Sequence, residues 1–250
     1  MSVTRLAELL ESRRPCVVLT GAGISTESGI PDFRSAGGIW AKYDPAEVAH
    51  IDAFRRDPAR VWEFYALRLD GLAQAEPNDG HRALAELEGQ GWVRAVVTQN
   101  VDGLHQRAGS SPERIVEIHG TMHEVVCMEC GERAPMERAL ARVRAGEADP
   151  SCRSCGGILK SATISFGQNL VPEDLRRAEQ AALRADLLLA IGSTLAVYPA
   201  AGVVPTAKRA GARVVILNAE ATKMDDLADA VLRGSISAIL PRLVDPRPEG

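Results

Sequence analysis

Five short apolar runs recur along the chain and predict the strands of a buried sheet. They lie at 16–20, 93–98, 114–118, 187–191 and 213–217. Each run is almost continuously apolar, which is typical of parallel strands covered on both faces. Stretches with helical spacing alternate with them, among them 1–14, 78–90 and 172–184. This alternation predicts an α/β fold built on a doubly wound parallel sheet.

Two segments interrupt the alternation and predict a second, smaller lobe. Segment 36–77 is helical in pattern and rich in aromatic residues, and segment 121–157 contains four of the five cysteines. We therefore assign 1–35, 78–120 and 158–250 to the main domain, and 36–77 (a helical insertion) and 121–157 to the small lobe. The tail 245–250 contains two prolines and is expected to fray.

Composition and charge exclude several classes of function. The 250 residues are 46% hydrophobic and 25% charged, as in an ordinary globular protein. The net charge of −4 gives no electrostatic reason to expect nucleic acid or an anionic membrane surface as a partner. No apolar run approaches the roughly 18–20 residues that span a bilayer. The N-terminus mixes acidic and basic residues and does not resemble a signal peptide. We expect a cytoplasmic monomer with reduced thiols.

Four cysteines form two C-x-x-C pairs and predict a metal centre. Cys127 and Cys130 make the first pair, and Cys152 and Cys155 make the second. Two such pairs supply four thiolates for a tetrahedral zinc ion. The coordination shell would be complete, so the zinc would be structural and not catalytic. The alternative is two unrelated buried cysteine pairs, or a redox dithiol.

Polar side chains follow several of the predicted strands. A glycine-rich loop containing Gly21 and Gly23 comes directly after the first strand. Its spacing is not G-x-G-x-x-G, so alone it indicates either a phosphate-binding loop or a tight turn without a ligand. Gln99, Asn100 and Asp102 follow the second strand. Ligands bind such sheets at the carboxyl ends of the strands, so these side chains mark a candidate site. His119 also falls just past a strand, although a lone histidine is more often structural.

The ordered set of motifs resembles one family. It comprises GAGISTESGIPDFRS from residue 21, TQNVDGLHQRAG from residue 98, His119-Gly120, the two C-x-x-C pairs, Phe166-Gly167, Gly192-Ser193-Thr194 and Asn218. The chain is similar to the sirtuin family of NAD-dependent protein deacylases over nearly its whole length. The resemblance implies a Rossmann-like NAD-binding main domain and acyl-lysine proteins as substrates.

The resemblance also implies roles for individual residues. The implied NAD contacts are Gly21, Ala22, Gly23, Glu27, Asp32, Phe33, Arg34, Trp40, Gln99, Asn100, Asp102, Gly192, Ser193, Thr194, Asn218, Glu220 and, by a looser match, Ile236. Ile164, Phe166 and Gly167 match the segment that pairs with the substrate peptide as an added strand. The metal ligands remain the four cysteines.

The family reaction consumes NAD and does not reduce it. Nicotinamide leaves, the acyl oxygen attacks the exposed ribose carbon, and an O-alkylimidate forms. Asn100 and Asp102 would orient the ribose and the nicotinamide amide. His119 would act as general base on a ribose hydroxyl, a task that suits an imidazole at neutral pH. The products would be nicotinamide, free lysine and O-acyl-ADP-ribose.

The acyl specificity is the open question. Tyr65 and Arg68 are three residues apart on a predicted helix and match a pair that favours succinyl- or malonyl-lysine in one sirtuin class. Physically, a guanidinium can bind a carboxylate through two hydrogen bonds while a phenol adds another. The alternative is a packed aromatic residue beside a solvated arginine. The chain also departs from the family beside the peptide cleft, where Lys160-Ser161 replaces Arg-Pro and Gln168 replaces Glu. A third departure, Gly192-Ser193-Thr194 in place of Gly-Thr-Ser, lies in the NAD loop.

Two other functions use the same features. A mono-ADP-ribosyltransferase or NAD glycohydrolase would use the same NAD pocket but transfer the ribosyl group elsewhere. A non-catalytic NAD-sensing, zinc-binding module would need neither Asn100 and Asp102 nor His119. The intact set favours the deacylase.

Overall fold

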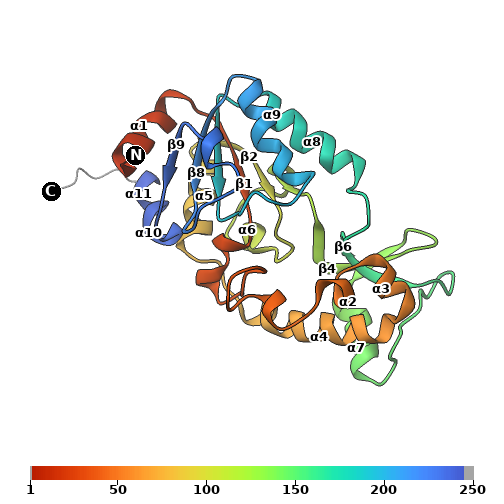
Figure 1. The fold of residues 1–250 in the computed structure, drawn as a ribbon. Helices are drawn as coiled ribbons and strands as arrows, with labels where there is room; N and C mark the ends of the chain where they lie inside the picture. The colour runs from red at the N-terminus through yellow and green to blue at the C-terminus, as the bar shows by residue number, and fades with distance from the viewer. Residues whose placement is uncertain (1, 245–250) are drawn as a thin grey trace.

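The computed structural model describes residues 2–244 and divides into a larger and a smaller lobe (Figure 1). The larger lobe contains a six-stranded parallel sheet with the order β3-β2-β1-β7-β8-β9. The strands are β1 (Cys16–Thr20), β2 (Val93–Thr98), β3 (Ile115–Glu117), β7 (Leu187–Ile191), β8 (Arg213–Leu217) and β9 (Ala230–Leu232). The five apolar runs thus form five neighbouring strands, and the predicted doubly wound α/β class is confirmed.

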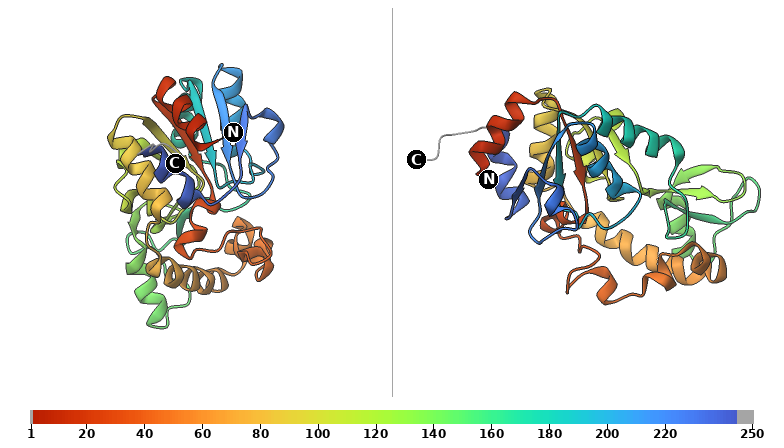
Figure 2. Two further views of the ribbon diagram at one scale, coloured as in Figure 1. Left: turned by 90° about the vertical axis from the view of Figure 1, so that its left-hand side faces the viewer. Right: turned by 45° about the horizontal axis from the view of Figure 1, so that its top comes forward.

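Helices cover both faces of this sheet, which explains the continuous apolar runs (Figure 2). In β1, Cys16 and Val18 face one core, and Val17 and Leu19 face the other. The first core is closed by α1 (Val3–Ser12), α5 (Asp79–Gly89), α10 (Ile236–Ile239) and α11 (Pro241–Val244). The second is closed by α8 (Pro172–Leu183) and α9 (Val203–Arg209).

The smaller lobe combines a three-stranded antiparallel sheet with helices. Its strands have the order β5-β4-β6 and are β4 (Gly120–Cys127), β5 (Arg133–Pro135) and β6 (Leu159–Thr163). Its helices are α2 (Pro45–Val48), α3 (Ile51–Arg56), α4 (Pro58–Gln74) and α7 (Met136–Arg144). Phe54, Trp62 and Met136 lie in the core between them.

Strand β6 lies in the small lobe, beyond the boundary predicted after residue 157. Residues 159–163 were assigned to the main domain, but β6 pairs with β4 and belongs to the sheet of the small lobe. The physical reason is that Lys160 and Ser161 make this strand unlike the apolar strands of the large sheet. The strand returns to the cleft at Ile164, whose N–H donates to the carbonyl of His119 (2.8 Å).

Short helical turns connect these elements. They are α6 (Leu104–Arg107) and the 3₁₀ turns Ala22–Ile24, Thr26–Ser28, Ile39–Ala41, Pro112–Arg114, Ala200–Gly202 and Asp225–Leu227. Within residues 2–244, no helix is both long and apolar enough to cross a membrane. The predicted fraying at 245–250 lies outside the described residues.

Candidate functional site

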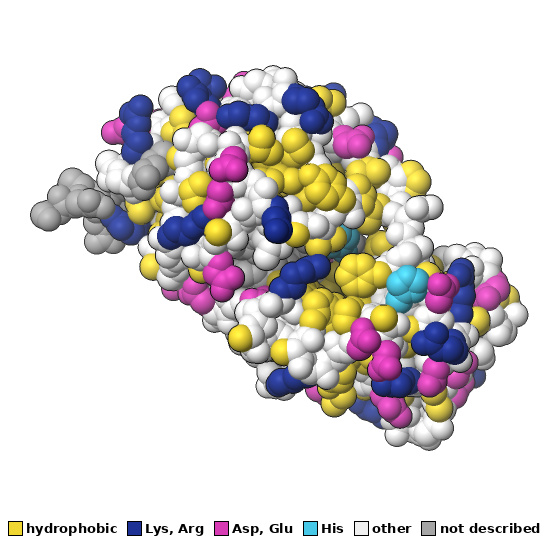
Figure 3. Space-filling view, in the orientation of Figure 1, with side chains coloured by type: hydrophobic (Ala, Val, Ile, Leu, Met, Phe, Trp, Pro, Cys, Tyr) yellow, Lys and Arg dark blue, Asp and Glu magenta, His cyan; other side chains and the backbone are white. Residues whose placement is uncertain are grey.

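The candidate site lies at the carboxyl ends of β1, β2 and β7, beside the junction of the two lobes. Because the strands are parallel, the loops that follow them meet at one edge of the sheet. Figure 3 shows the surface hollowed between the lobes, with hydrophobic, basic and histidine side chains gathered there.

Glycines bring two of these loops into backbone contact. The Gly23 N–H donates to the Gly192 carbonyl (2.8 Å). A Cβ on Gly23 would lie 2.8 Å from that oxygen, and one on Gly21 would lie equally close to it. Gly192 has φ +63°, and a Cβ there would lie 2.4 Å from the Ile24 nitrogen. The glycines therefore allow the two loops to pack backbone against backbone at this sheet edge.

The polar residues after β2 form a connected buried cluster. Asn100 and Asp102 are each 7% exposed. Asn100 Nδ2 donates to Ser25 Oγ (3.1 Å) and to the Gly21 carbonyl (3.2 Å), and Ser25 Oγ donates to Asp102 Oδ2 (2.8 Å). Sequence reasoning did not assign Ser25, although it lies in the motif that follows Gly21. Its role depends on a partner 77 positions away, which spacing alone does not reveal.

His119 is held by a backbone carbonyl. Its Nδ1 lies 3.1 Å from the carbonyl oxygen of Gln99, which can only accept. Nδ1 therefore carries the proton and Nε2 is left as the basic nitrogen. Burial lowers the pKa of His119 below its ordinary value, and the bond to Gln99 opposes that shift. The ring is thus neutral at pH 7 and able to accept a proton.

The remaining loops place further predicted residues around this centre. Gln99 Nε2 donates to Ser193 Oγ (2.9 Å), and Asn218 Nδ2 donates to the carbonyl of Glu220 (2.9 Å). Ser235 Oγ donates to Glu27 Oε1 (3.0 Å) across 208 positions of sequence. Ser235 was not predicted. Among the other predicted residues, Ala22 is half-buried, Arg34 and Thr194 are exposed, and Ile236 is buried beside Gly80.

An aromatic cluster joins the loop after β1 to the small lobe. Phe33 and Trp40 have ring centroids 5.1 Å apart, and Trp40 lies 6.4 Å from Phe166. The loop is shaped by Asp32, whose Oδ1 accepts from the N–H groups of Arg34 (3.1 Å) and Ser35 (2.9 Å). The structure thus brings the loop predicted to bind NAD next to the segment predicted to bind the peptide.

The segment predicted to bind the peptide is anchored at Phe166 to the two residues that flank His50. The Phe166 N–H donates to the Ala49 carbonyl (2.8 Å), and the Phe166 carbonyl accepts from the Ile51 N–H (2.9 Å). The Phe166 ring remains 42% exposed, and Gly167 has φ +83°. The segment therefore presents an aromatic ring to the cleft from a fixed backbone.

Two departures from the family pattern, at Lys160-Ser161 in β6 and at Gln168, are accommodated by local hydrogen bonds. Lys160 is fully buried, and its ammonium donates to the carbonyls of Ser161 (3.0 Å) and Thr163 (2.5 Å). Burial lowers the pKa of Lys160 to about 8. Gln168 Oε1 accepts from the Ser165 N–H (2.9 Å). These side chains stabilise the segment itself.

Tyr65 and Arg68 share α4 but point toward different neighbours. Tyr65 is buried, its hydroxyl lies within hydrogen-bonding reach of the hydroxyls of Ser161, Thr163 and Ser165, and burial raises its pKa to about 12. The Arg68 guanidinium lies 5.5 Å from the Phe33 ring centroid. Burial lowers the pKa of Arg68, while the negative charge of Asp102 opposes the shift.

A cavity of about 230 Å³ lies between α4 and the loop 29–43. Its wall includes Arg68, Phe64, Leu67 and Lys42. Tyr65 is not part of this wall. Arg68 therefore lies between an open space and the polar cluster around Asp102.

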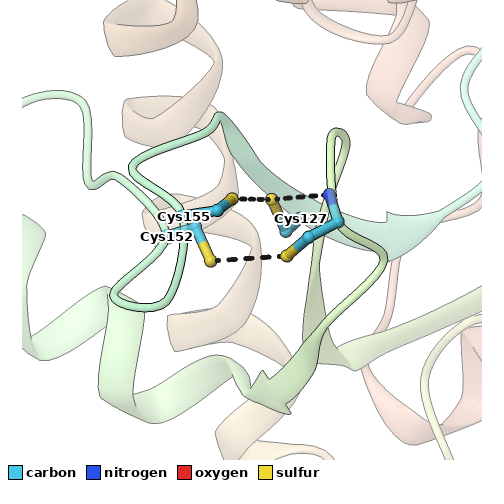
Figure 4. Close-up of side chains that lie close together, drawn as sticks. Cys127, Cys152 and Cys155 are labelled. Carbon is cyan, nitrogen blue, oxygen red and sulfur yellow. Dashed lines mark hydrogen bonds between the residues drawn. The ribbon is translucent and has the colours of Figure 1, made fainter.

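The four cysteines converge from two turns (Figure 4). The Sγ atoms lie 3.5 Å apart for Cys127 and Cys155 and 3.8 Å apart for Cys130 and Cys152. All four lie within 4.8 Å of one another. A tetrahedron with zinc–sulfur bonds of about 2.3 Å has sulfur–sulfur edges of about 3.8 Å. The donor set therefore fits one zinc ion, as predicted.

Comparisons with known proteins agree with this architecture. The family model described as the Sir2 family matches residues 21–199. A curated relative from Pyrobaculum aerophilum, named NAD-dependent protein deacylase 2, is 47% identical over 240 residues, covering 96% of this chain and 94% of its own. A Streptomyces coelicolor relative, named NAD-dependent protein deacetylase 2, is 46% identical over 229 residues, covering 91% of this chain and 95% of its own.

Solved structures give the same result. One from a study of the mechanism and regulation of Sir2 enzymes has a TM-score of 0.89 and 44% identity, covering 97% of this chain and 96% of its own. Another, a Sir2 complex with a p53 peptide and NAD+, has a TM-score of 0.89 and 35% identity, covering 98% of each. The chain belongs to the Sir2 family.

Proposed function

We propose that this Sir2-family enzyme, an NAD-dependent protein deacylase, removes acetyl groups from protein lysines and also accepts succinyl and malonyl groups. The observation that carries the deacylase proposal is the His119 ring, neutral and fixed by Gln99, beside the buried Asn100–Ser25–Asp102 cluster. The products would be nicotinamide, free lysine and O-acyl-ADP-ribose. Relatives named deacylase and deacetylase support the reaction class.

NAD would lie across the glycine contact at the sheet edge. Gly21, Gly23 and Gly192 let the two loops approach closely, and the pyrophosphate would lie on these loops, with Ser193 and Asn218 toward the adenosine. When bound, NAD supplies an electrophilic ribose carbon and nicotinamide as the leaving group. Asn100 and Asp102 would orient the ribose and the nicotinamide amide, because each side chain is already fixed by a hydrogen bond with Ser25.

His119 has a single proton-accepting atom. Its Nδ1 proton is held by the Gln99 carbonyl. Nε2 would therefore be the atom that takes a proton from a ribose hydroxyl of bound NAD. The Ile164 N–H bond to the His119 carbonyl ties this base to the start of the peptide segment. The acyl-lysine would enter beside Phe166. We expect the enzyme to work as a monomer and without nucleic acid.

Arg68 is the proposed contact for an acidic acyl group. Its guanidinium is half-buried against Phe33, feels the charge of Asp102, and lies next to the cavity along α4. A succinyl carboxylate would supply a bidentate partner, which the guanidinium does not have among residues 2–244. Tyr65 would contribute by turning its hydroxyl from the β6 hydroxyls toward that carboxylate.

The test is mass spectrometry of one peptide carrying acetyl-, malonyl- or succinyl-lysine, incubated with NAD. Transfer of the acyl group to ADP-ribose is expected for all three. Formation of ADP-ribose with the acyl-lysine left intact would indicate an NAD glycohydrolase instead. No NAD consumption at all would indicate a non-catalytic module.

Arg68→Met tests the acyl contact. We expect desuccinylation to fall on the order of 100-fold in kcat/KM and deacetylation to change little, because only the dicarboxylic group loses an ion pair. Arg60→Met is the matched control, since Arg60 lies on the same helix in an exposed ion pair with Glu47. Equal loss of both activities in Arg68→Met would remove Arg68 from the acyl pocket.

A further inference from the structure

Two buried histidines lie beneath the polar cluster and take no part in the reaction described above. The rings of His81 and His105 are 5.0 Å apart, edge to face. His105 is 1% exposed and stands on the short helix α6, three residues after Asp102. Burial lowers its pKa to about 4, so the ring is neutral near pH 7.

The tautomer of His105 follows from the hydroxyl beside it. His105 Nε2 lies 3.0 Å from Thr20 Oγ1, and that hydroxyl donates to Thr98 Oγ1 (2.8 Å). Because the Thr20 proton is directed at Thr98, the Thr20 oxygen must accept from His105. Nε2 therefore carries the ring proton. Nδ1 is left as a buried acceptor that has no hydrogen-bond partner among residues 2–244.

The two threonines accept hydrogen bonds from the turn that follows β2. Thr98 Oγ1 also accepts from the Asn100 N–H (3.1 Å). The Thr20 carbonyl accepts from the Gln99 N–H (3.0 Å) and from Gln99 Nε2 (3.3 Å). The Asn100 N–H is thus held by the hydroxyl chain that ends at His105, and the adjoining Gln99 is bound to the backbone of the same Thr20.

We propose that His105 is a positioning residue for the deacylation reaction, acting through Thr20 and Thr98 on the Gln99–Asn100 turn. Two groups depend on that turn. The Asn100 side chain lies in the cluster with Ser25, and the Gln99 carbonyl sets the proton on His119. His105 touches no reacting atom. The inference rests on the proposed function, and its test includes a readout that needs no turnover.

The variants separate the hydrogen bond from the packing. His105→Leu keeps an apolar side chain in the core and leaves the Thr20 oxygen without its donor. His105→Gln offers an amide N–H at similar reach and serves as the conservative rescue. Thr20→Val removes the same bond from the other side, and Thr20→Ser restores the hydroxyl. Each variant is characterised by its melting temperature, kcat, and KM for NAD and for an acetyl-lysine peptide.

We expect kcat to fall 10- to 100-fold in His105→Leu and in Thr20→Val, the order expected when catalytic groups are slightly displaced. The KM for the peptide should change little, and His105→Gln and Thr20→Ser should recover most of kcat. Nicotinamide exchange, which reports on the departure of nicotinamide that Asn100 would assist, should slow in parallel. Combining His105→Leu with Thr20→Val should cost no more than either alone, because both break one chain of contacts.

Histidine nitrogen NMR gives the readout that is independent of activity. In the wild type, His105 should be protonated at Nε2 and His119 at Nδ1, and the His119 signals should shift in His105→Leu but not in His105→Gln. Unchanged kcat and unchanged His119 signals in a folded His105→Leu or Thr20→Val protein would overturn the proposal. If His105→Leu fails to fold, the comparison of Thr20→Val with Thr20→Ser tests the proposal instead. A wild type that deacylates no peptide contradicts the proposed function and leaves the NMR result to judge the positioning role.

Discussion

Acid should destabilise this protein through its buried histidines, and His105 gives the clearest case. The pKa of its ring is about 4 in the folded protein, against an ordinary value of 6.5, because burial penalises the charged form. The unfolded chain therefore binds a proton between pH 6.5 and 4 that the folded chain does not bind. Stability is lost as the pH falls through that window.

The magnitude follows from the two pKa values. Between pH 7 and pH 5, a shift from 6.5 to about 4 removes about 2 kcal/mol from the free energy of unfolding. His105→Gln cannot take up this proton, so its stability should fall by about 2 kcal/mol less than that of the wild type over the same range. All other titrating groups are shared, including His81, whose pKa burial lowers to about 3.

The assay is urea unfolding of the wild type and His105→Gln at pH 7, 6 and 5 with zinc in excess, followed by far-UV circular dichroism. His123→Gln is the control, because His123 is an exposed histidine. The two stability curves should converge as the pH falls. Parallel curves for the wild type and His105→Gln would refute the conclusion that the buried ring stays neutral.

Three further outcomes are expected. His119→Ala should abolish deacylation but leave NAD binding by calorimetry unchanged, because the ring is placed to move a proton; retained peptide turnover would exclude it as the base. Cys127→Ser, or chelation, should lower the melting temperature by several degrees through loss of metal-binding energy, and an unaltered melting profile would contradict a structural zinc. Gly192→Ala should weaken NAD binding at least tenfold, because its Cβ would lie 2.4 Å from the Ile24 nitrogen, whereas Gly37→Ala, with open space around it, should bind NAD as the wild type does.

The large sheet could be predicted because each of its inner strands is apolar on both faces. The same criterion failed where that burial is absent. Strand β9 is only three residues long and half-buried, and so shows no apolar run. Strand β6 contains Lys160 and Ser161, which are buried through hydrogen bonds that the pattern of apolar residues cannot anticipate.

The candidate site could be predicted only in part for a related reason. The rule that ligands bind at strand ends identified Gln99, Asn100 and Asp102 from local sequence. The rule did not identify Ser25 and Ser235, because their hydroxyls donate to carboxylates 77 and 208 positions away in the sequence. Helical spacing placed Tyr65 and Arg68 on one face of α4, but it does not determine which neighbour each side chain turns toward.

The strand β4 begins at Gly120, directly after His119, the proposed general base, and ends at Cys127, the first of the four cysteines that fit a zinc ion. The eight residues of β4 thus connect the cysteine cluster to His119, with an irregular pairing against β6 between Gly120 and Val125. Oxidation of the cysteines or loss of their metal would therefore act on the far end of the strand that begins beside His119, at a distance from the cleft.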